Sequence, residues 1–145
     1  MEQIAVKKIR PGAKLPSFGT PEAAGADLYA CLEADVTIMP GETFFVPTGL
    51  SMALPKGYAG FVFARSGMAC KRGLAPANKV GVIDSDYRGE LMIALHNHGT
   101  EPQTVSDGER VAQLILLPVL TPVYLEADAL DETERGTGGF GSTGK

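Results

Sequence analysis

The stretch Gly81–Leu91, GVIDSDYRGEL, places five polar side chains in a row between two apolar runs. Residues 80–83 precede them as a short β-type run, and a second extended run follows over residues 90–96. A strand, a turn and a strand in this order predict a hairpin. Two carboxylates and a phenol on its turn suit a small ligand that needs an acceptor and a flat apolar surface. A solvated polar turn, which is common in proteins, explains the same residues.

Outward from this stretch, short runs of β-branched and aromatic residues alternate with Pro and Gly at spacings of roughly 8–12 residues. This pattern predicts an all-β fold, either a distorted β-barrel or a jelly-roll-like sandwich. The segment 64–73 interrupts the pattern and predicts one short helix that ends at Gly73. The other expected strands are residues 4–9, 24–30, 36–39, 43–46, 50–54, 58–63, 111–119 and 123–125.

Length and composition indicate a single globular domain. A chain of 145 residues with 44% hydrophobic residues can bury a core without disulfide bonds. The net charge of −4 is unlike that of proteins that bind duplex DNA or an anionic membrane. Cys31 and Cys70 form no CxxC motif, and we expect them to be packing residues. No apolar run approaches transmembrane length and residues 1–12 lack a leader-like core, so we expect a cytoplasmic protein.

The C-terminal part of the chain consists of an acidic stretch, residues 126–134, and a Gly-rich tail, residues 135–145. We therefore predict a folded β domain at 1–125 and a flexible arm at 126–145. The glycines formally match GxGxxG and GxxxxGK, but the strand and helix that those motifs require are missing from the pattern. Arg135 and the glycine amides can still bind phosphate, and Phe140 can stack on a planar base. A disordered tail with an isolated phenylalanine is the alternative.

Five motifs taken together resemble the trimeric all-β dUTP diphosphatases, the dUTPases. In chain order they are AGADLYA at Ala24–Ala30, ARSGMA at Ala64–Ala69, GVIDSDYRGEL at Gly81–Leu91, RVAQLIL at Arg110–Leu116 and RGTGGFGSTG at Arg135–Gly144. Each motif is weak alone. Five of them in the family's order, over most of the chain, make a chance match implausible.

The resemblance implies hydrolysis of dUTP to dUMP and pyrophosphate with Mg²⁺. It implies a homotrimer in which each of three active sites takes motifs from all three chains. The metal is then held mainly by substrate phosphates and waters, with Asp27 in its outer shell. The cellular role implied is to limit uracil in DNA and to supply dUMP for thymidylate synthesis, with neither nucleic acid nor membrane as a partner.

Three residues carry the catalytic roles that the resemblance implies. Asp84 matches the carboxylate that orients and deprotonates the water attacking the α-phosphorus, and that also accepts a hydrogen bond from the 3′-hydroxyl. Ser66 matches the serine near the bridging oxygen that leaves. Gln113 matches the amide that reaches phosphate or its waters.

The resemblance also implies a set of substrate-binding residues. Tyr87 matches the ring beneath deoxyribose that leaves no room for a 2′-hydroxyl, and Asn78 matches a position near uracil. Backbone groups of the hairpin provide much of the uracil recognition, and we assign Val82, Ile83 and Met92 to this part of the site. The residues that match phosphate or lid positions are Arg65, Ser66 and Gly67 in the second motif, and Arg135, Gly138, Phe140, Gly141, Ser142 and Thr143 in the arm.

Some residues depart from the commonest family pattern. Ala64 stands where proline often precedes Arg-Ser, and Met68 stands where leucine often follows. Neither change removes a group that contacts phosphate, so we expect both to be tolerated. We interpret His96 and His98 of the HNHG segment as surface histidines without a catalytic role.

Two other functions are compatible with parts of this pattern. One is a dCTP deaminase of the same fold, alone or bifunctional, which would release ammonia from dCTP. The other is a nucleotide sensor that binds dUTP without turnover. The form of GVIDSDYRGEL and the complete glycine arm favour uracil, and the joint presence of Asp84, Ser66, Arg135 and Phe140 favours an active enzyme.

Overall fold

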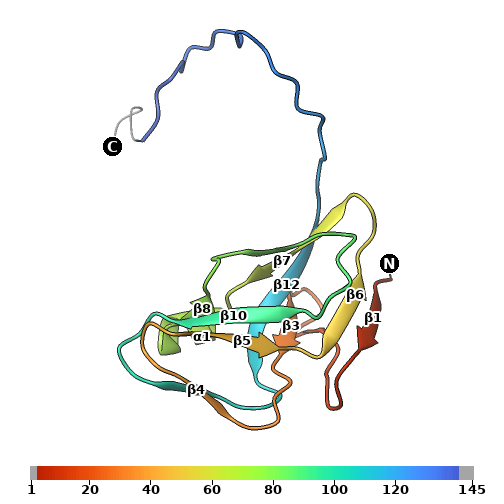
Figure 1. Ribbon diagram of the computed structural model, residues 1–145, viewed down its shortest axis with the longest axis vertical. Coiled ribbons are helices and arrows are strands. Elements are labelled where there is room, and N and C mark those ends of the chain that lie inside the picture. The colour runs from red at the N-terminus through yellow and green to blue at the C-terminus, as the bar shows by residue number, and fades with distance from the viewer. Residues whose placement is uncertain (1–2, 141–145) are drawn as a thin grey trace.

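The computed structural model describes residues 3–140 and confirms the all-β class with one short helix. Within those residues, twelve strands form sheets of five, three, two and two strands, and none of these sheets closes into a barrel (Figure 1). Of the two architectures expected from the sequence, the sandwich therefore fits the molecule and the barrel does not.

The two larger sheets contain most of the backbone pairing, and every strand pair in them is antiparallel. The five-stranded sheet has the order β2 (Ser17–Phe18), β3 (Ala26–Tyr29), β12 (Arg110–Pro118), β7 (Tyr58–Phe63) and β9 (Gly81–Ile83). The three-stranded sheet has the order β5 (Thr43–Pro47), β10 (Met92–Asn97) and β8 (Leu74–Pro76). The two small sheets pair β1 (Ala5–Lys8) with β6 (Leu50–Ala53), and β4 (Val36–Ile38) with β11 (Gln103–Val105).

The core forms where the inward faces of these sheets meet. Along β10, Ile93, Leu95 and Asn97 are buried while the residues between them are partly exposed, as expected for a strand with one face on the core. Leu28 of β3 and Val111 of β12 are fully buried in the same cluster. The 3-residue and 4-residue strands alone bury little surface, so the stability of the fold depends on this shared cluster.

The helix α1 (Ser66–Arg72) follows β7 and ends where the sequence predicts. Gly73 has a φ of +66° and its N–H donates to the carbonyl of Ala69 at 3.1 Å. Glycine adopts this left-handed conformation without strain, which explains the end of the helix. Met68 is buried beneath α1, so the departure from leucine at this position preserves an apolar contact.

Two expectations from the sequence are wrong. The strands on either side of residues 84–91 do not form a hairpin with each other, because β9 pairs with β7 whereas β10 pairs with β5 and β8. Residues 123–125 form no strand, because no other segment among residues 3–140 pairs with them. The sequence also did not reveal β2, β8 and β11, each of only two or three residues.

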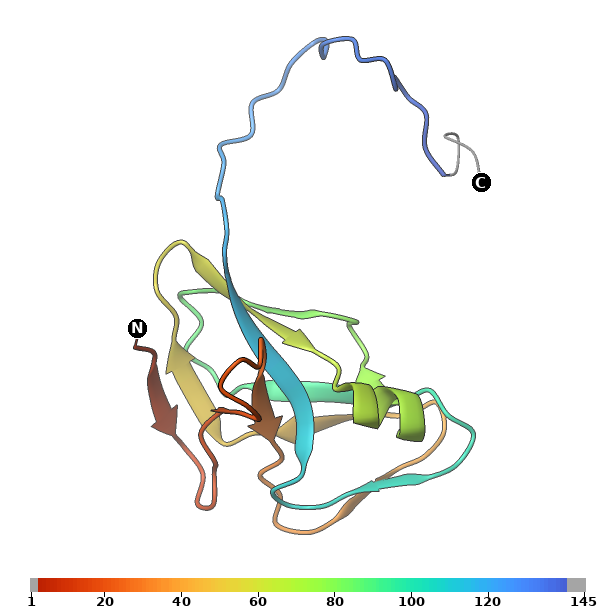
Figure 2. The same cartoon turned by 180° about the vertical axis from the view of Figure 1, so that it is seen from behind.

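From Thr121 onward the chain leaves the body as an extended arm (Figures 1 and 2). Both views show it rising from the end of β12 and curving over the body without touching it. Leu120, Val123, Tyr124 and Leu125 are each at least 85% exposed. No helix among residues 3–140 is long and apolar enough to cross a membrane. Cys31 and Cys70 are both free thiols, the first buried and the second exposed.

One buried polar side chain, Asn97, joins three parts of the fold. Its Nδ2 donates to the carbonyls of Ile38 on β4, at 2.9 Å, and of Glu101, at 2.8 Å. Its Oδ1 accepts from the N–H of Gly99 at 2.9 Å. Because Asn97 is fully buried, removing the amide would leave these backbone groups without partners.

We predict that Asn97→Ala lowers the free energy of unfolding by about 2–4 kcal/mol, through lost hydrogen bonds and unpaired buried groups. Urea unfolding at fixed protein concentration measures the change. Thr37→Ala is the matched control, because Thr37 of β4 bonds Thr104 of β11 at 3.0 Å on the exposed surface, and its loss costs less than about 1 kcal/mol. Equal losses in the two variants would contradict this role of Asn97.

Candidate active site

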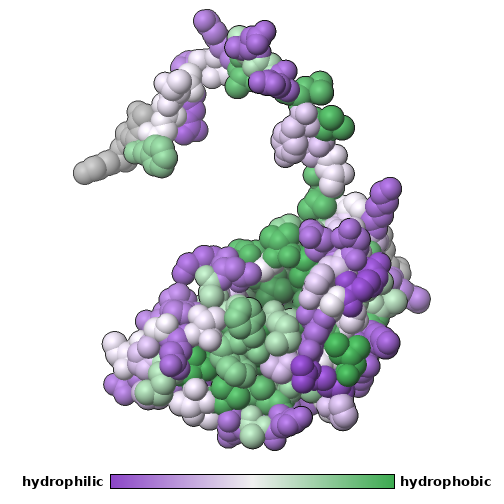
Figure 3. Space-filling view, in the orientation of Figure 1, coloured by the Kyte–Doolittle hydropathy of each residue, from purple (hydrophilic) through white to green (hydrophobic). Residues whose placement is uncertain are grey.

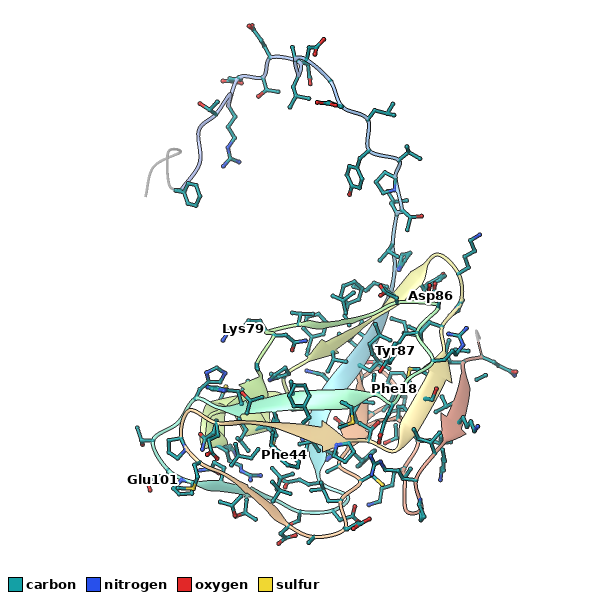
Figure 4. All side chains as sticks on the ribbon, viewed as in Figure 1. Phe18, Phe44, Lys79, Asp86, Tyr87 and Glu101 are labelled. Carbon is teal, nitrogen blue, oxygen red and sulfur yellow. The ribbon has the colours of Figure 1, made fainter. Side chains whose placement is uncertain are left out.

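A cleft of about 250 Å³ opens beside the loop that joins β9 to β10. The six residues assigned to the nucleoside side of the site all line it: Asn78, Val82, Ile83, Asp84, Tyr87 and Met92. Figure 4 shows Tyr87 and Asp86 on this loop, at the end of the body away from Glu101. The cleft thus brings together the residues of one predicted half of the site.

The cleft wall is built by the pairing of β9 with β7. The register places Val82 opposite Phe61 and Ile83 opposite Gly60. Ile83 is therefore buried against the core, whereas Val82 is 61% exposed in the cleft. The exposed side chain and the neighbouring backbone groups give this wall the mixed apolar and hydrogen-bonding character that a nucleobase requires.

A tight turn before β9 positions Asn78. The N–H of Val80 donates to the carbonyl of Asn78 at 2.7 Å, and Lys79 between them has a φ of +64°. A Cβ at Gly81 would lie 3.4 Å from Nδ2 of Asn78 and 3.2 Å from Val62. Glycine at position 81 therefore lets the turn fold close to β7 with the Asn78 amide on the cleft side.

The loop after β9 carries Asp84 and Tyr87, both exposed. The N–H of Tyr87 donates to the carbonyl of Asp84 at 3.2 Å, which closes a turn. The Tyr87 hydroxyl donates to the carbonyl of Glu90 at 2.9 Å. A Cβ at Gly89 would collide with the Tyr87 ring, so the ring lies directly over the backbone there.

The second half of the predicted site is an ion-pair cluster around Asp27. Arg65 Nε donates to Asp27 Oδ1 at 2.7 Å, and Arg110 donates to Oδ2 at 3.3 Å. Asp27 itself is 8% exposed, and two guanidinium groups compensate its buried charge. The cluster leaves a net positive charge at the surface, as a phosphate site requires.

Gln113 connects this cluster to the start of α1. On β12 it lies between Asp27 of β3 and Phe63 of β7, and its Nε2 donates to the carbonyl of Ala64 at 2.8 Å. A Cβ at Gly25 would lie 2.6 Å from its Oε1, so glycine is needed there. The sequence left open whether Gln113 bonds backbone or phosphate, and in this chain its amide N–H₂ bonds backbone.

Ser66 and Gly67, the first residues of α1, are exposed next to this cluster. A Cβ at Gly67 would meet no atom within 4 Å, so the space above this turn is open to a ligand. Arg65, before them, has an extended backbone, and its carbonyl accepts from the N–H of Ala69 at 2.9 Å. The backbone hydrogen bonds of α1 therefore hold the turn at Arg65–Gly67, and no side chain in the described part of the chain caps the start of the helix.

Within residues 3–140, no group of three or more His, Cys, Asp or Glu side chains is arranged to hold a metal ion. Both oxygens of Asp27, the residue expected near the metal, are already used by arginines. These residues do not fit a metal site in which protein side chains supply all the ligands. They fit Mg²⁺, which keeps most of its waters and binds phosphate oxygens of the substrate.

The arm residues lie away from both halves in this chain (Figures 1 and 2). Arg135 Nε donates to the carbonyl of Gly138 at 2.8 Å, and Phe140 is fully exposed. Gly141, Ser142 and Thr143 lie outside the described residues. The structure therefore shows the predicted arm residues near one another but not beside the cleft.

The sequence did not reveal four residues that shape these two regions: Phe45 and Glu90, which line the cleft, Arg110 beside Asp27, and Arg10, which binds Glu90. Each of these residues has its contact partners far away in the sequence, and a local sequence pattern cannot predict such contacts. His96 bonds Thr43 at 2.8 Å and His98 is exposed, and neither lines the cleft.

Comparison with known proteins gives one consistent family. The dUTPase family model matches residues 12–144. The deoxyuridine 5′-triphosphate nucleotidohydrolases of Desulfitobacterium hafniense and Syntrophotalea carbinolica are 55% and 49% identical to this chain, over 98% and 97% of its length and 95% and 96% of theirs. A dUTPase variant of Staphylococcus bacteriophage 80alpha, solved with dUpNHpp, has a TM-score of 0.89 at 26% identity and full coverage of both chains. The chain belongs to the dUTPase family.

Proposed function

We propose that this chain hydrolyses dUTP to dUMP and pyrophosphate, with the nucleoside in the cleft beside Asp84 and Tyr87. The observation that carries the proposal is the convergence of six predicted residues on that one cleft. The relatives named as dUTP nucleotidohydrolases and the phage enzyme solved with dUpNHpp support the same substrate. They favour the hydrolase over the deaminase and the sensor.

The cleft supports selection of both base and sugar. Val82, Ile83 and Met92 form walls that fit a flat pyrimidine, and Asn78 supplies an amide at one edge. Tyr87 presents its ring face to the sugar, where a 2′-hydroxyl would have no room. A close backbone wall excludes the methyl group of thymine by steric conflict.

The proposed chemistry is a single displacement at the α-phosphorus. Asp84 accepts a proton from a water whose oxygen attacks phosphorus, and the bond to the oxygen that bridges the α- and β-phosphates breaks. The electron pair of that bond leaves with pyrophosphate. Such general-base assistance contributes about 10²–10⁴ in rate.

Stabilisation of phosphate charge supplies the remainder of the rate enhancement. Arg65 and Arg110 provide guanidinium groups, Ser66 a hydroxyl near the leaving oxygen, and Gln113 an amide beside them. Asp27 keeps Arg65 in place through the 2.7 Å hydrogen bond. When bound, Mg²⁺ would neutralise charge on the phosphate oxygens, and Asp27 is the residue that would contact the waters of that ion.

The two halves of the proposed site lie near opposite ends of β7 within a single chain. Ile83, the residue before Asp84, pairs with Gly60 near the start of β7. Arg65, by contrast, comes two residues after Phe63, the last residue of that strand. At about 3.3 Å per residue, the length of β7 separates these ends by about 17 Å. This separation supports a site completed by a second copy, as in the homotrimer with shared sites.

The arm completes this arrangement by reaching a site formed by other chains. Its exposed apolar side chains Leu120, Val123, Tyr124 and Leu125 would gain burial by contact with another copy, which supports this arrangement. Apolar side chains also lie on the exposed face of β5 and β10, including Phe45 and Met92 (Figure 3). In this proposal the arm expected at residues 126–145 carries Arg135 to phosphate and Phe140 to uracil, although the chain already leaves the body at Thr121.

This activity would limit uracil in DNA and supply dUMP for thymidylate synthesis. Both substrate and product are small nucleotides, which agrees with a cytoplasmic enzyme that needs neither nucleic acid nor membrane as a partner. The net charge of −4 supports this, because the phosphate-binding charge is confined to a few placed arginines.

We expect pyrophosphate release with Mg²⁺ from dUTP and little from dTTP, dCTP or UTP at equal concentration. Asp84→Asn should lower kcat by about 10²–10⁴-fold, because the amide cannot accept the proton, while dUTP binding is largely kept. Asp86→Asn is the matched control on the same loop, and it should retain most turnover because Asp86 does not line the cleft. Normal turnover by Asp84→Asn would refute the mechanism, and ammonia release from dCTP would refute the substrate assignment.

Mixing two inactive variants tests the shared site. Asp84→Asn and Ser66→Ala chains, unfolded together at equal amounts and refolded, should regain activity in about a quarter of the sites, because each site takes its two halves from different chains. Each variant refolded alone gives the baseline. Activity that stays at this baseline in the mixture would show that one chain supplies both residues.

Deleting residues 135–145 should reduce kcat/KM for dUTP strongly while the assembly and the unfolding midpoint stay unchanged. The described part of this segment makes no contact with the body (Figures 1 and 2), so its loss removes no core packing. Light scattering and urea unfolding check the assembly and the fold. A truncated chain with full activity would remove the arm from the mechanism.

A further inference from the structure

A bidentate ion pair joins the loop of the cleft to the N-terminal segment. Arg10 Nε donates to Glu90 Oε1 at 2.6 Å, and Arg10 NH2 donates to Oε2 at 2.8 Å. The residues are 80 positions apart in sequence. The planar guanidinium fixes the carboxylate in orientation as well as in position, because both hydrogen bonds must form together.

The same carboxylate is held from a third segment. Gly49, in the turn between β5 and β6, donates its N–H to Glu90 Oε1 at 2.9 Å. Gly49 has a φ of +69°, and a Cβ there would lie 2.7 Å from Ala13, so this close approach requires glycine. The hydrogen bonds from Arg10 lower the pKa of Glu90 below its ordinary value, against an opposing effect of burial. Glu90 is therefore an ionised anchor at neutral pH.

Glu90 in turn supports Tyr87. The Tyr87 hydroxyl donates to the main-chain carbonyl of Glu90 at 2.9 Å, and the ring lies over Gly89. The position of the ring thus depends on the position of the backbone at residues 89–90. That backbone is held by the side chain of Glu90, and hence by Arg10.

Other anchors hold the two ends of the loop without Arg10. Leu91 donates to the carbonyl of Leu50 at 2.8 Å, and its own carbonyl accepts from Thr48 Oγ1 at 2.7 Å. At the other end, β9 is paired with β7 up to Ile83, next to Asp84. Within the loop, Ser51 Oγ donates to the carbonyl of Arg88 at 2.7 Å. Loss of the ion pair would therefore leave Asp84 in place and loosen chiefly Glu90, whose carbonyl accepts the hydrogen bond from the Tyr87 hydroxyl.

We propose that the Arg10–Glu90 ion pair positions the Tyr87 ring and thereby sets the preference of this enzyme for deoxyribose over ribose. The inference rests on the proposed function, in which Tyr87 lies against the sugar. Arg10 and Glu90 are positioning residues, since Arg10 does not line the cleft and acts only through Glu90.

The test compares dUTP with UTP. Arg10→Met should lower the ratio of kcat/KM for dUTP to that for UTP by about 3–10-fold, the scale of one charge-assisted hydrogen-bonded pair. The change should appear in KM, with kcat for dUTP nearly unchanged. Arg10→Lys keeps the positive charge but cannot form two parallel hydrogen bonds to the carboxylate, so it should restore part of the ratio.

The double variant Arg10→Met/Glu90→Gln should lower the ratio no further than either single variant, because both substitutions remove the same interaction.

Arg72→Met is the matched control. Arg72, in the last turn of α1, forms an ion pair with Glu109, and neither residue lines the cleft. Its loss should change turnover of dUTP and UTP by the same factor and leave their ratio unaltered. A merely structural role of Arg10 would give this same result.

Calorimetric binding of dUDP and UDP separates this proposal from the proposed function, because it needs no turnover. A smaller dUDP preference in Arg10→Met than in the parent supports the ion pair as a determinant of sugar choice, whether or not dUTP is hydrolysed. An unchanged preference in both Arg10→Met and Glu90→Gln overturns it, even if the parent hydrolyses dUTP normally.

Discussion

The antiparallel register of β12 fixes the phosphate half of this molecule. Gln113 has Asp27 on one side and Phe63 on the other, so the residues that follow Phe63 meet the carboxylate of Asp27 across a single strand. A shift of one residue in either ladder would turn Gln113 or Asp27 to the opposite face of the sheet. The Arg65–Asp27 contact, the start of α1 and the open space above Gly67 all follow from this alignment.

The loop that carries Asp84 and Tyr87 differs from a hairpin tip in one important respect. Its two ends enter different sheets, through β9 and through β10. A hairpin can twist as a unit, but when the two ends of a segment are attached to different sheets, those ends can move relative to each other only if the sheets do. The cleft therefore has a pre-formed wall, and its specificity depends on side chains within the loop rather than on closure of the loop.

The sequence predicted most of the strands because Pro and Gly mark their ends, and it predicted the end of α1 because Gly73 is the only residue there suited to a left-handed backbone. It also identified six residues that share the cleft, since they are close together in sequence or belong to one motif. It failed where partners are distant. The pairing of β9 with β7, the Arg10–Glu90 ion pair and the lack of a strand at 123–125 all depend on which segments meet in space. Strands of two or three residues, such as β8, carry too little pattern to be recognised.

If the arm is needed for activity as proposed, its exposure has a consequence for how this protein is inactivated. From Thr121 to Phe140 the backbone has no partner in the body, and almost every side chain is exposed. A protease that cuts once in this segment removes Phe140 and leaves every buried residue of the core in place. The remaining fragment would stay folded, so the proteases that degrade unfolded chains would not remove it. The protein could then lose its activity while its amount in the cell stays the same.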